Sequence, residues 1–498
     1  MPTKRKRQRN AQSILPSKKN AETSAVSATV LLSPSPDAPP DSLKRKTAGQ
    51  LDPGSLASVV SEEEIEIAVE TLDSLAQHPV LVKSKACRNL RTAVYGFKQA
   101  CTTGMNTVAG TNLTSRVSAA LVDGKYVDAI VLLAEMRIRN QAPKLGALCR
   151  WVRDLDVVSG LSSETPDIRT DTQLELLRVM DMVLRVTGPV DEVSKVPADL
   201  TGPLSLQPIW DITDKTQMPR PAVRQGVLDK TIFASCPEDI KDRFQILETT
   251  PGPERKPPNL HPAVLYLSND YAVPLATVGP ETTLHKHPTV PGLSLVKDVL
   301  SRQECMSIVA AMETVGFLPD CPLRDDGSAS SILAHNVYWV VDQAFHDVLW
   351  GRVSTHIPPS LGGRRARGIN RRFRVYRYVP GAEYRCHFDG GWPPSGVDPK
   401  TGAYVYDASP EGSKQSSLFT FLVYLNDEFE GGETTFFTPS IREGVMNAHP
   451  VRPTMGSVAL FPHGDAKGAL LHEGTGVRKG AKYIIRTDVE FDVEPGRD

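Results

Sequence analysis

The chain has 498 residues and a hydrophobic content of 40%, which permits more than one domain and at least one sizeable core. Its formal net charge of −1 averages over strongly charged local runs and therefore indicates no particular class of partner. No stretch approaches the ~18 apolar residues that a membrane span requires, and the seven cysteines include no Cys-x-x-Cys pair. The composition thus speaks against a membrane-spanning or disulfide-framed protein, and we expect a soluble intracellular protein with reduced cysteines.

Residues 1–54 form a polar tail rich in Ser, Pro, Lys and Arg, with the sequence LSPSPDAPPDS in its middle. Such a segment buries too little apolar surface to offset the entropy of ordering, so we expect it to be disordered. Two basic runs, KRKRQR at residues 4–9 and LKRKTAG at 43–49, match nuclear-import signals and match a solvated basic tail equally well. No apolar segment follows the basic N-terminus, so we expect no secretion and predict nuclear residence.

Residues 55–190 carry apolar side chains at helical spacing, as in Ile65, Val69 and Leu72, and predict a small all-helical domain. Within this region, residues 79–153 hold twelve Lys or Arg against three acidic residues. A basic face of this kind is most often simply solvated, and otherwise it marks an acidic partner or nucleic acid.

Residues 191–290 show turn signals every few residues and little periodicity, as in MPRPAV and ETTPGPERKPPNLHP. Segments rich in Pro and Gly rarely continue a helix or a central strand. We therefore predict a Pro-rich connector, partly docked on the domain that follows it.

From residue 291 to residue 495 the pattern changes to one helix, residues 301–316, followed by short strands separated by Gly, Pro and Asp. The predicted strands are, in order, RFRVYRYV, YRCHFDGG, SLFTFLVYLND, GGETTFFTP, GSVALFPH, ALLHEGTGV and AKYIIRTDVEF. We expect a double-stranded β-helix, that is a jelly roll, with flanking helices. This fold brings residues that are far apart in sequence together at one open end.

His387 and Asp389 are separated by one residue, so both side chains leave an extended strand on the same face. A His-x-Asp triplet alone is a weak signal, and His463 and Asp465 form a second one. A mononuclear non-haem iron that binds O2 and an organic acid needs two imidazoles and one carboxylate on one face. His472 lies 83 residues after Asp389, far enough for the intervening strands to return the chain beside the first pair. We predict that His387, Asp389 and His472 bind the metal, and we assign the second triplet to a loop.

Three blocks make the resemblance to a known family specific: YVPGAEYRCHFDGG, FLVYLNDEFEGGETTFF and LLHEGTGVRKGAKYIIRTDVEF. Together they resemble the prolyl 4-hydroxylase catalytic family of Fe(II)/2-oxoglutarate-dependent dioxygenases over roughly residues 290–493. The resemblance implies an oxidoreductase with Fe(2+) and 2-oxoglutarate as cofactors and O2 as cosubstrate. It also implies L-ascorbate (vitamin C), which restores iron oxidised in uncoupled turnovers.

The resemblance further implies residues that bind 2-oxoglutarate. In the family a Lys follows the distal His by ten residues, and here it is Lys482. A buried distal carboxylate needs a fixed cation, and tyrosine hydroxyls can complete its hydrogen bonds. Tyr424 and Tyr378 match tyrosines that contact the cosubstrate in relatives. Other branches of the superfamily use an arginine near Arg486, so Lys482 ranks first and Arg486 second.

Residues 364–377 hold seven arginines immediately before the strand that bears His387. Alternation places Arg374 on the same face as Tyr378, so Arg374 faces the mouth of the site if Tyr378 faces its interior. One interpretation is that Arg374 contacts an acidic substrate segment. A solvated basic edge strand that discourages aggregation is at least as compatible with the pattern.

The function that the sequence favours is hydroxylation of a protein side chain. That the hydroxylated residue is proline is implied by the family resemblance alone. Two alternatives stay open. One is a non-catalytic nuclear interaction protein that binds its partner through the basic helical domain. The other is a nucleic-acid-directed oxidative demethylase, which suits the basic patches but lacks the sequence blocks of those enzymes.

The basic runs of the tail lead to a first prediction. A fluorescent fusion that lacks residues 1–50 should spread into the cytoplasm, because both import signals are removed. Fluorescence microscopy of the full-length and truncated fusions measures this distribution. Nuclear retention of the truncated fusion would show that the tail does not contain the nuclear-import signal.

Overall fold

The computed structural model of the chain describes residues 60–103, 112–162, 169–214, 222–255, 261–319 and 334–493. The predicted tail, residues 1–54 with both basic runs, lies outside these ranges. Two compact units are distinguished, Met1–Ala93 and Val94–Asp498. No helix within the described ranges has both the length and the apolar content that crossing a membrane would take.

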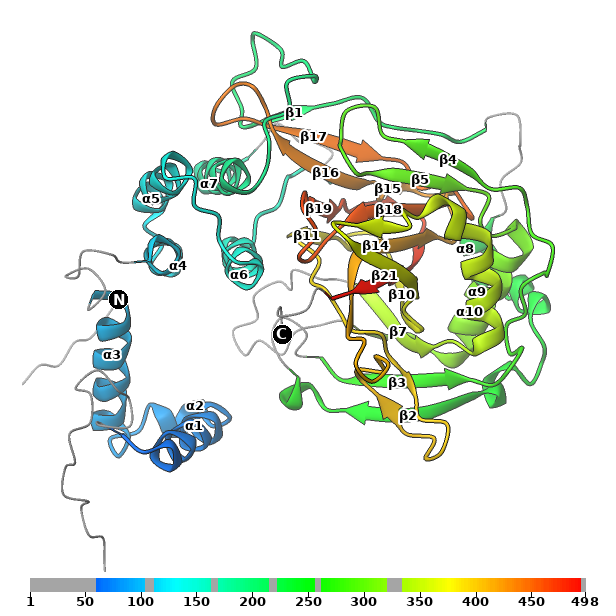
Figure 1. The fold of residues 1–498 in the computed structure, drawn as a ribbon, viewed down its shortest axis with the longest axis horizontal. Helices are drawn as coiled ribbons and strands as arrows, with labels where there is room; N and C mark the ends of the chain where they lie inside the picture. Colours follow the sequence, from blue (N-terminus) through cyan, green and yellow to red (C-terminus); the bar gives the residue numbers. More distant parts are fainter. Residues whose placement is uncertain are drawn as a thin grey trace, which may run out of the picture. The chain divides into compact units, whose positions relative to one another are not determined.

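Most of the described strands belong to two sheets of the second unit (Figure 1). The five-stranded sheet has the order β1 (Leu204–Leu206), β17 (Met446–Val451), β16 (Thr434–Pro439), β19 (Leu471–Gly474) and β11 (Tyr384–His387). The main path of the twelve-stranded sheet is β2 (Phe244–Thr250), β3 (Ala263–Ser268), β7 (Ala334–Val340), β10 (Arg372–Tyr378), β21 (Lys482–Asp492), β14 (Gln415–Tyr424), β18 (Val458–Pro462), β5 (Ser294–Lys297) and β4 (Thr283–Lys286). Its remaining strands are β6 (Leu318–Pro319), β8 (Ser360–Leu361) and β9 (Arg364–Ile369). Nearly all pairs are antiparallel, which agrees with the predicted jelly-roll architecture.

Two two-stranded sheets complete the strands of the described residues: the hairpin of β12 (Gly396–Val397) with β13 (Tyr404–Val405), and the pairing of β15 (Glu430–Gly431) with the distant β20 (Val477–Lys479). The connection from β15 to β16 needs its glycine pair. Gly431 and Gly432 have φ angles of +74° and +69°, and a Cβ atom on Gly431 would lie 2.4 Å from the carbonyl oxygen of Gly476. Only glycine fits such a turn, as expected for a tight strand connection.

The helices are α1 (Glu62–Ala76), α2 (Pro79–Val82), α3 (Arg88–Thr103), α4 (Leu113–Val122), α5 (Tyr126–Ile138), α6 (Leu145–Leu155), α7 (Asp171–Thr187), α8 (Val223–Leu228), α9 (Arg302–Val315) and α10 (Gln343–Val353). Short 3-10 turns are η3 (Thr231–Ser235), η4 (Ile240–Arg243), η5 (Gly252–Glu254) and η6 (Ser354–His356). The predicted helix at residues 301–316 is α9, which begins with a reciprocal capping box between Ser301 and Glu304.

Helices α9 and α10 cover one face of the larger sheet (Figure 1) and share a large apolar core with β10, β14 and β21. An ion pair ties the two helices together, because Glu304 accepts two hydrogen bonds from the Arg352 guanidinium. Both side chains are 7% exposed, so this pair is largely shielded from solvent and from salt. The sheet is thereby supported on the side away from the candidate site.

Helices α4 to α7 do not stand apart from the sheets. Their buried side chains form one apolar core with residues of β11, β16, β17 and β19, which include Cys386 and Phe388. Trp151 of α6 is completely buried there, and its indole N–H donates to Ser118 Oγ at 2.7 Å. Removing such a side chain costs about 3–5 kcal/mol of stability. The predicted boundary at residue 190 between a helical domain and later domains is therefore not a boundary in the structure, which divides the chain after Ala93.

The predicted connector, residues 191–290, is also part of the folded sheets. It contributes β1 to the smaller sheet and β2, β3 and β4 to the larger one. The prediction of an irregular connector was wrong for these strands. The partner of β1 lies more than two hundred residues away and one partner of β3 lies 73 residues away, and Pro-containing loops separate the paired strands β2 and β3 and the paired strands β4 and β5. The two sheets therefore include strands that lie well before residue 291.

Candidate functional site

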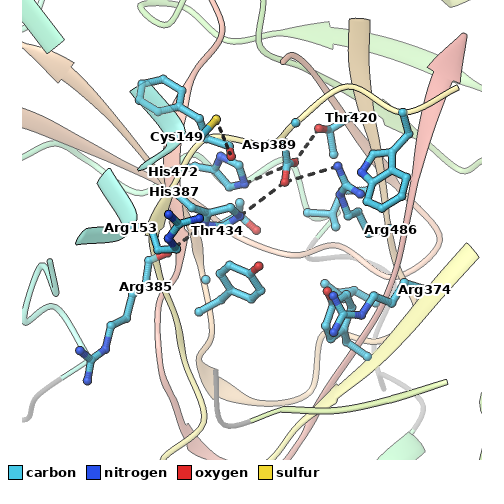
Figure 2. A pocket seen from close by; sticks show the side chains of 18 of the residues that line it. Cys149, Arg153, Arg374, Arg385, His387, Asp389, Thr420, Thr434, His472 and Arg486 are labelled. Carbon is cyan, nitrogen blue, oxygen red and sulfur yellow. Dashed lines mark hydrogen bonds and ion pairs between the residues drawn. The ribbon is translucent and has the colours of Figure 1, made fainter. Parts of the chain in front are cut away.

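The three predicted metal ligands lie together at the end of the smaller sheet. Strands β11 and β19 pair antiparallel, and this register sets His387 directly opposite His472. Asp389 follows two residues after His387. His387 Nε2 lies 3.6 Å from Asp389 Oδ1, and His472 Nε2 lies 3.7 Å from Asp389 Oδ2. Figure 2 shows the two imidazoles and the carboxylate pointing toward one another.

Both imidazoles are held in the tautomer that leaves Nε2 free to bind a metal. His387 Nδ1 lies 2.8 Å from the carbonyl oxygen of Arg385, and His472 Nδ1 lies 3.1 Å from that of Leu470. A carbonyl oxygen only accepts, so each Nδ1 carries the proton and donates it. Burial, and then the neighbouring His387, lower the pKa of His472 to about 3, so this ring is neutral at physiological pH.

Asp389 is kept ionised despite its burial. Burial by itself would raise its pKa, but the Arg486 guanidinium and the two imidazoles outweigh burial and hold the pKa of Asp389 well below its usual range. Arg486 lies 3.4 Å from Asp389 Oδ1 and also pairs with Asp488 at 3.1 Å. The hydroxyl of Thr420 donates to Asp389 Oδ2 at 2.7 Å. The site therefore presents an ionised carboxylate beside the neutral imidazole of His472 and the imidazole of His387.

A chain of hydrogen bonds behind Asp389 fixes its orientation. Thr420 Oγ1 donates to Asp389, so it accepts from His463 Nδ1, which lies 2.7 Å away. His463 Nε2 is then an acceptor, and the Ser417 hydroxyl lies 2.8 Å from it. Ser417 in turn accepts from the backbone N–H of Trp392 at 2.9 Å. Each member thus has one defined direction, and the chain orients the carboxylate.

The second His-x-Asp triplet lies in the loop after β18, as predicted, but His463 has a further role beside the metal ligands. His463 is 1% exposed and belongs to the layer that supports the metal ligands, whereas Asp465 is exposed. The position of Thr420 could have been predicted from the sequence, because alternation along β14 places the side chains of Thr420 and Leu422 on the same face of the strand. His463 could not be assigned from sequence, because its partners Ser417 and Thr420 lie on another strand.

Lys482 begins β21 and lies opposite Tyr378 of β10. Its side chain is 3% exposed, and no ion pair or hydrogen bond to it is found among the described residues. Burial lowers the pKa of Lys482 to about 8. Its ammonium lies 5.7 Å from the ring centroid of Tyr378 and 5.9 Å from that of Tyr424. An uncompensated buried cation of this kind is strongly disfavoured unless an anion joins it.

The other residues predicted to bind the cosubstrate differ from one another in whether they line the cavity and in which groups they contact. Tyr378 lines the same cavity as Lys482, whereas Tyr424 is fully buried and its hydroxyl donates to Thr434 at 2.8 Å. Arg486 lines the cavity, but its guanidinium is engaged by Asp389 and Asp488. The geometry thus sets Lys482 beside an open space and Arg486 beside the metal ligands.

One cavity of about 820 Å³ contains these groups and opens toward solvent. Strand alternation holds as predicted, since Arg372, Arg374, Tyr376 and Tyr378 of β10 all line it. Helix α6 lines the opposite side with Cys149 and Arg153, which no sequence pattern had linked to the site (Figure 2). The cavity wall is therefore shared by both sheets and a helix.

The donor set fits a mononuclear iron(II) centre. His387, Asp389 and His472 are the ligand group of the described residues whose donor atoms lie within 4.8 Å of one another. Two imidazoles and one carboxylate leave the remaining coordination positions on the cavity side for small molecules. The ammonium of Lys482 lines the same cavity as these three side chains.

Residues 373–487 match the model of the 2OG-Fe(II) oxygenase superfamily. A comparison with curated proteins finds no significant match. Among solved structures, a viral collagen prolyl hydroxylase from Paramecium bursaria Chlorella virus-1 has 19% identity and a TM-score of 0.26, covering 41% of this chain and 97% of that one. A Pseudomonas putida prolyl-4-hydroxylase has 17% identity and a TM-score of 0.26, covering 40% and 92%. A Trichoplax adhaerens prolyl hydroxylase, in complex with a hypoxia inducible factor peptide fragment, has 15% identity and a TM-score of 0.28, covering 40% and 83%.

The ligand geometry generates a second prediction. His472→Ala should lose most of the iron affinity, because one of three protein ligands is removed. Metal analysis after anaerobic loading with Fe(II) measures this loss. The exposed His78 provides the control, and His78→Ala should load like the wild type. Full iron occupancy in the His472 variant would contradict the assignment.

The hydrogen-bond chain behind Asp389 generates a third prediction. Thr420→Val keeps the side-chain shape but deletes the hydroxyl that donates to Asp389. We expect iron affinity to fall by about 10- to 100-fold, as is usual when a group that orients a ligand is removed. Thr420→Ser restores a hydroxyl and should recover most of the affinity. Equal affinities in the Val and Ser variants would show that the hydroxyl does not act on the metal site.

Proposed function

We propose that the chain uses its 2OG-Fe(II) oxygenase domain, matched over residues 373–487, to hydroxylate a side chain of a protein. The domain itself makes the chain a 2-oxoglutarate-dependent dioxygenase, an oxidoreductase. The observation that carries the proposal is the placement of a buried, uncompensated Lys482 in the same cavity as the His387, Asp389 and His472 cluster. One cavity thus offers a metal site and a carboxylate site side by side.

When bound, iron and 2-oxoglutarate with O2 supply oxidative decarboxylation of the keto acid to succinate and CO2, and insertion of one oxygen atom into a substrate C–H bond. His387 and His472 would hold the metal through Nε2, and Asp389 through its carboxylate. Lys482 would bind the distal carboxylate of 2-oxoglutarate as a protonated ammonium. Tyr378 covers that ammonium and helps to exclude water.

Two features support a protein substrate. The sequence blocks around the ligands resemble those of the prolyl 4-hydroxylase family, which makes proline the first target residue to test. The cavity, at about 820 Å³, has room for a substrate segment in addition to a small organic acid. Tyrosine and arginine side chains that line it offer the planar contacts that peptide segments use.

The decisive experiment measures succinate formation by the purified full-length protein with Fe(II), 2-oxoglutarate and ascorbate. Peptide extracts and oligonucleotide extracts are supplied separately. We expect peptides to stimulate succinate release and expect ascorbate to sustain it. Stimulation by oligonucleotides alone would favour nucleic-acid demethylation, and absence of any succinate, with or without extract, would favour the non-catalytic interaction protein.

Lys482 generates a further prediction for 2-oxoglutarate binding. Lys482→Ala leaves a buried carboxylate without its counter-charge, which costs about 3–5 kcal/mol, so affinity should fall at least about a hundredfold. Anaerobic titration calorimetry measures the dissociation constant. Lys479 of β20 is exposed and pairs only with Glu430 at 3.1 Å, so Lys479→Ala is the matched control. An unchanged affinity in the Lys482 variant would move the role to Arg486.

The pH dependence of the same affinity gives an independent check. Because burial lowers the pKa of Lys482 to about 8, its ammonium is present below pH 8 and is lost above it. Binding of the carboxylate then requires uptake of a proton, so the dissociation constant should rise about tenfold per pH unit above pH 8. A dissociation constant that stays flat between pH 7 and pH 10 would contradict a charge-paired Lys482.

A further inference from the structure

The side chains next to the two predicted histidine ligands meet behind the metal site. Cys386 directly precedes His387 in β11. Glu473 directly follows His472 in β19. Strand alternation turns both neighbours away from the imidazoles, toward the face of the smaller sheet that helices α4 to α7 cover. The Sγ atom of Cys386 lies 3.5 Å from Glu473 Oε2, and both side chains are buried. The neighbours of the two ligands are therefore in contact with each other.

Glu473 carries a buried carboxylate that four donors satisfy. Its Oε1 atom accepts from the hydroxyls of Ser159 and Thr475. Its Oε2 atom accepts from the backbone N–H of Ser159 at 3.4 Å and from the Cys386 thiol. The described part of the chain offers no cation to Glu473, so these hydrogen bonds have to compensate its burial.

Stability alone would be served by an apolar side chain at this position. Cys386 and Leu471, on the same face as Glu473, belong to the apolar core that the sheet shares with helices α4 to α7. Replacing a buried charged group in a core by a hydrophobic residue of similar volume is often neutral or stabilising. Buried polar groups are best known for selecting one register of neighbouring segments. The partners of Glu473 show which register its hydrogen bonds select.

The segment of residues 157–162, which follows α6, contacts both ligand-bearing strands. The carbonyl oxygen of Val157 accepts from the backbone N–H of Cys386 at 3.3 Å, so the segment binds β11. Ser159 donates to Glu473 through its backbone N–H and its hydroxyl, so the segment also binds β19. Ser159 is completely buried, and water therefore does not compete for these hydrogen bonds.

Further contacts hold both ends of segment 157–162. Just before it, Asp156 forms an ion pair with Arg385 of β11. At its end, the Ser162 hydroxyl donates to Glu383 at 3.1 Å and accepts from the backbone N–H of Gly476 at 2.8 Å. The segment is thus fixed against the start of β11 and the end of β19.

Strand β11 needs support beyond its pairing with β19. Among the described strands it lies at the edge of the smaller sheet, and it has only four residues. Its pairing with β19 is irregular between Tyr384 and His387. Few ladder hydrogen bonds fix the register of such a strand, and a slip by one residue would turn its side chains to the other face. Segment 157–162 adds contacts that oppose such a slip.

We propose that Glu473 and Ser159 are positioning residues of the metal centre. Their hydrogen bonds join segment 157–162 to the back of β19 and β11, and thereby hold the imidazoles of His387 and His472 where both reach one metal ion. The inference rests on the proposed function, whose metal site it concerns. The segment lies outside the residues that match the oxygenase model, so the N-terminal helices become a working part of the oxygenase.

Metal binding by the full-length protein tests the proposal, with Co(II) as the probe. Co(II) accepts the same imidazole and carboxylate donors as Fe(II), and its visible absorption spectrum reports the geometry of its ligands. Ser159→Ala and Glu473→Met each break the link. We expect each to lower the Co(II) affinity about tenfold or more and to alter the spectrum. The double variant should lose no more affinity than the weaker single variant, because both changes remove one interaction.

Two further variants separate positioning from stability. Ser118→Ala removes the hydroxyl that accepts from Trp151, a link within the same helices. It should lower the melting temperature of the metal-free protein and leave the Co(II) affinity and spectrum unchanged. Ser162→Ala removes a half-buried hydroxyl and serves where the Glu473 variant does not fold. It should change the affinity and the spectrum in the same direction as Ser159→Ala, by a smaller amount.

The outcomes separate the two proposals. Variants of Ser159 and Glu473 that melt at a lower temperature but keep the wild-type Co(II) affinity and spectrum would overturn the positioning role. Additive losses in the double variant would overturn it as well, as would an equal loss of affinity in Ser118→Ala. Succinate release by the wild type would leave the hydroxylase function standing in each of these cases. Loss of Co(II) binding in the variants, with no succinate from the wild type, would support the positioning role and contradict the hydroxylase function.

Discussion

The pairing of β11 with β19 is the constraint on which the site depends. It places His387 directly opposite His472, although the two residues are 85 positions apart in the sequence. A shift of this register by one residue would turn one imidazole to the other face of the sheet. Helices α6 and α7 pack against the same sheet, and the shared apolar core with Cys386 and Phe388 holds the register in place. The helices therefore help to hold the predicted metal ligands in position.

Strand β21 carries two cationic side chains of the cavity, and their surroundings differ. Lys482 and Arg486 are four residues apart and face the same cavity, as the period of a strand requires. Arg486 is committed to Asp389 and Asp488, which keeps the ligand carboxylate ionised in a buried place. Lys482 has no such partner among the described residues, so its charge is available to an acid that enters from outside. One positive charge of the strand is thus neutralised by carboxylates beside the metal ligands, and the other lines the cavity without an ion pair among the described residues.

Strand β10 continues this arrangement toward solvent. Tyr378 lies against Lys482, Tyr376 stacks on Tyr378 with ring centroids 5.6 Å apart, and Arg374 lies over Tyr376. A stack of two tyrosine rings therefore lies between the two cations, Lys482 at one end and Arg374 at the other. Such an arrangement is rigid and keeps positive charge directed into the cavity. It connects the proposed cosubstrate site to the arginines of β10 through one strand.

The sequence by itself determined the local features: the helix at residues 301–316, the central strands, and the residue types His387, Asp389, His472 and Lys482 at their spacings. These follow from periodicity and from the chemistry that a metal and a buried acid require, both of which act over short stretches of chain. Tertiary structure decided the rest. The support of Asp389 by His463, the strands within residues 191–290, the merging of helices α4 to α7 with the smaller sheet, and the convergence of Arg255 on Tyr338 all join segments that are distant in sequence. No local pattern records such contacts, because strand register and helix docking are set by the packing of the whole core.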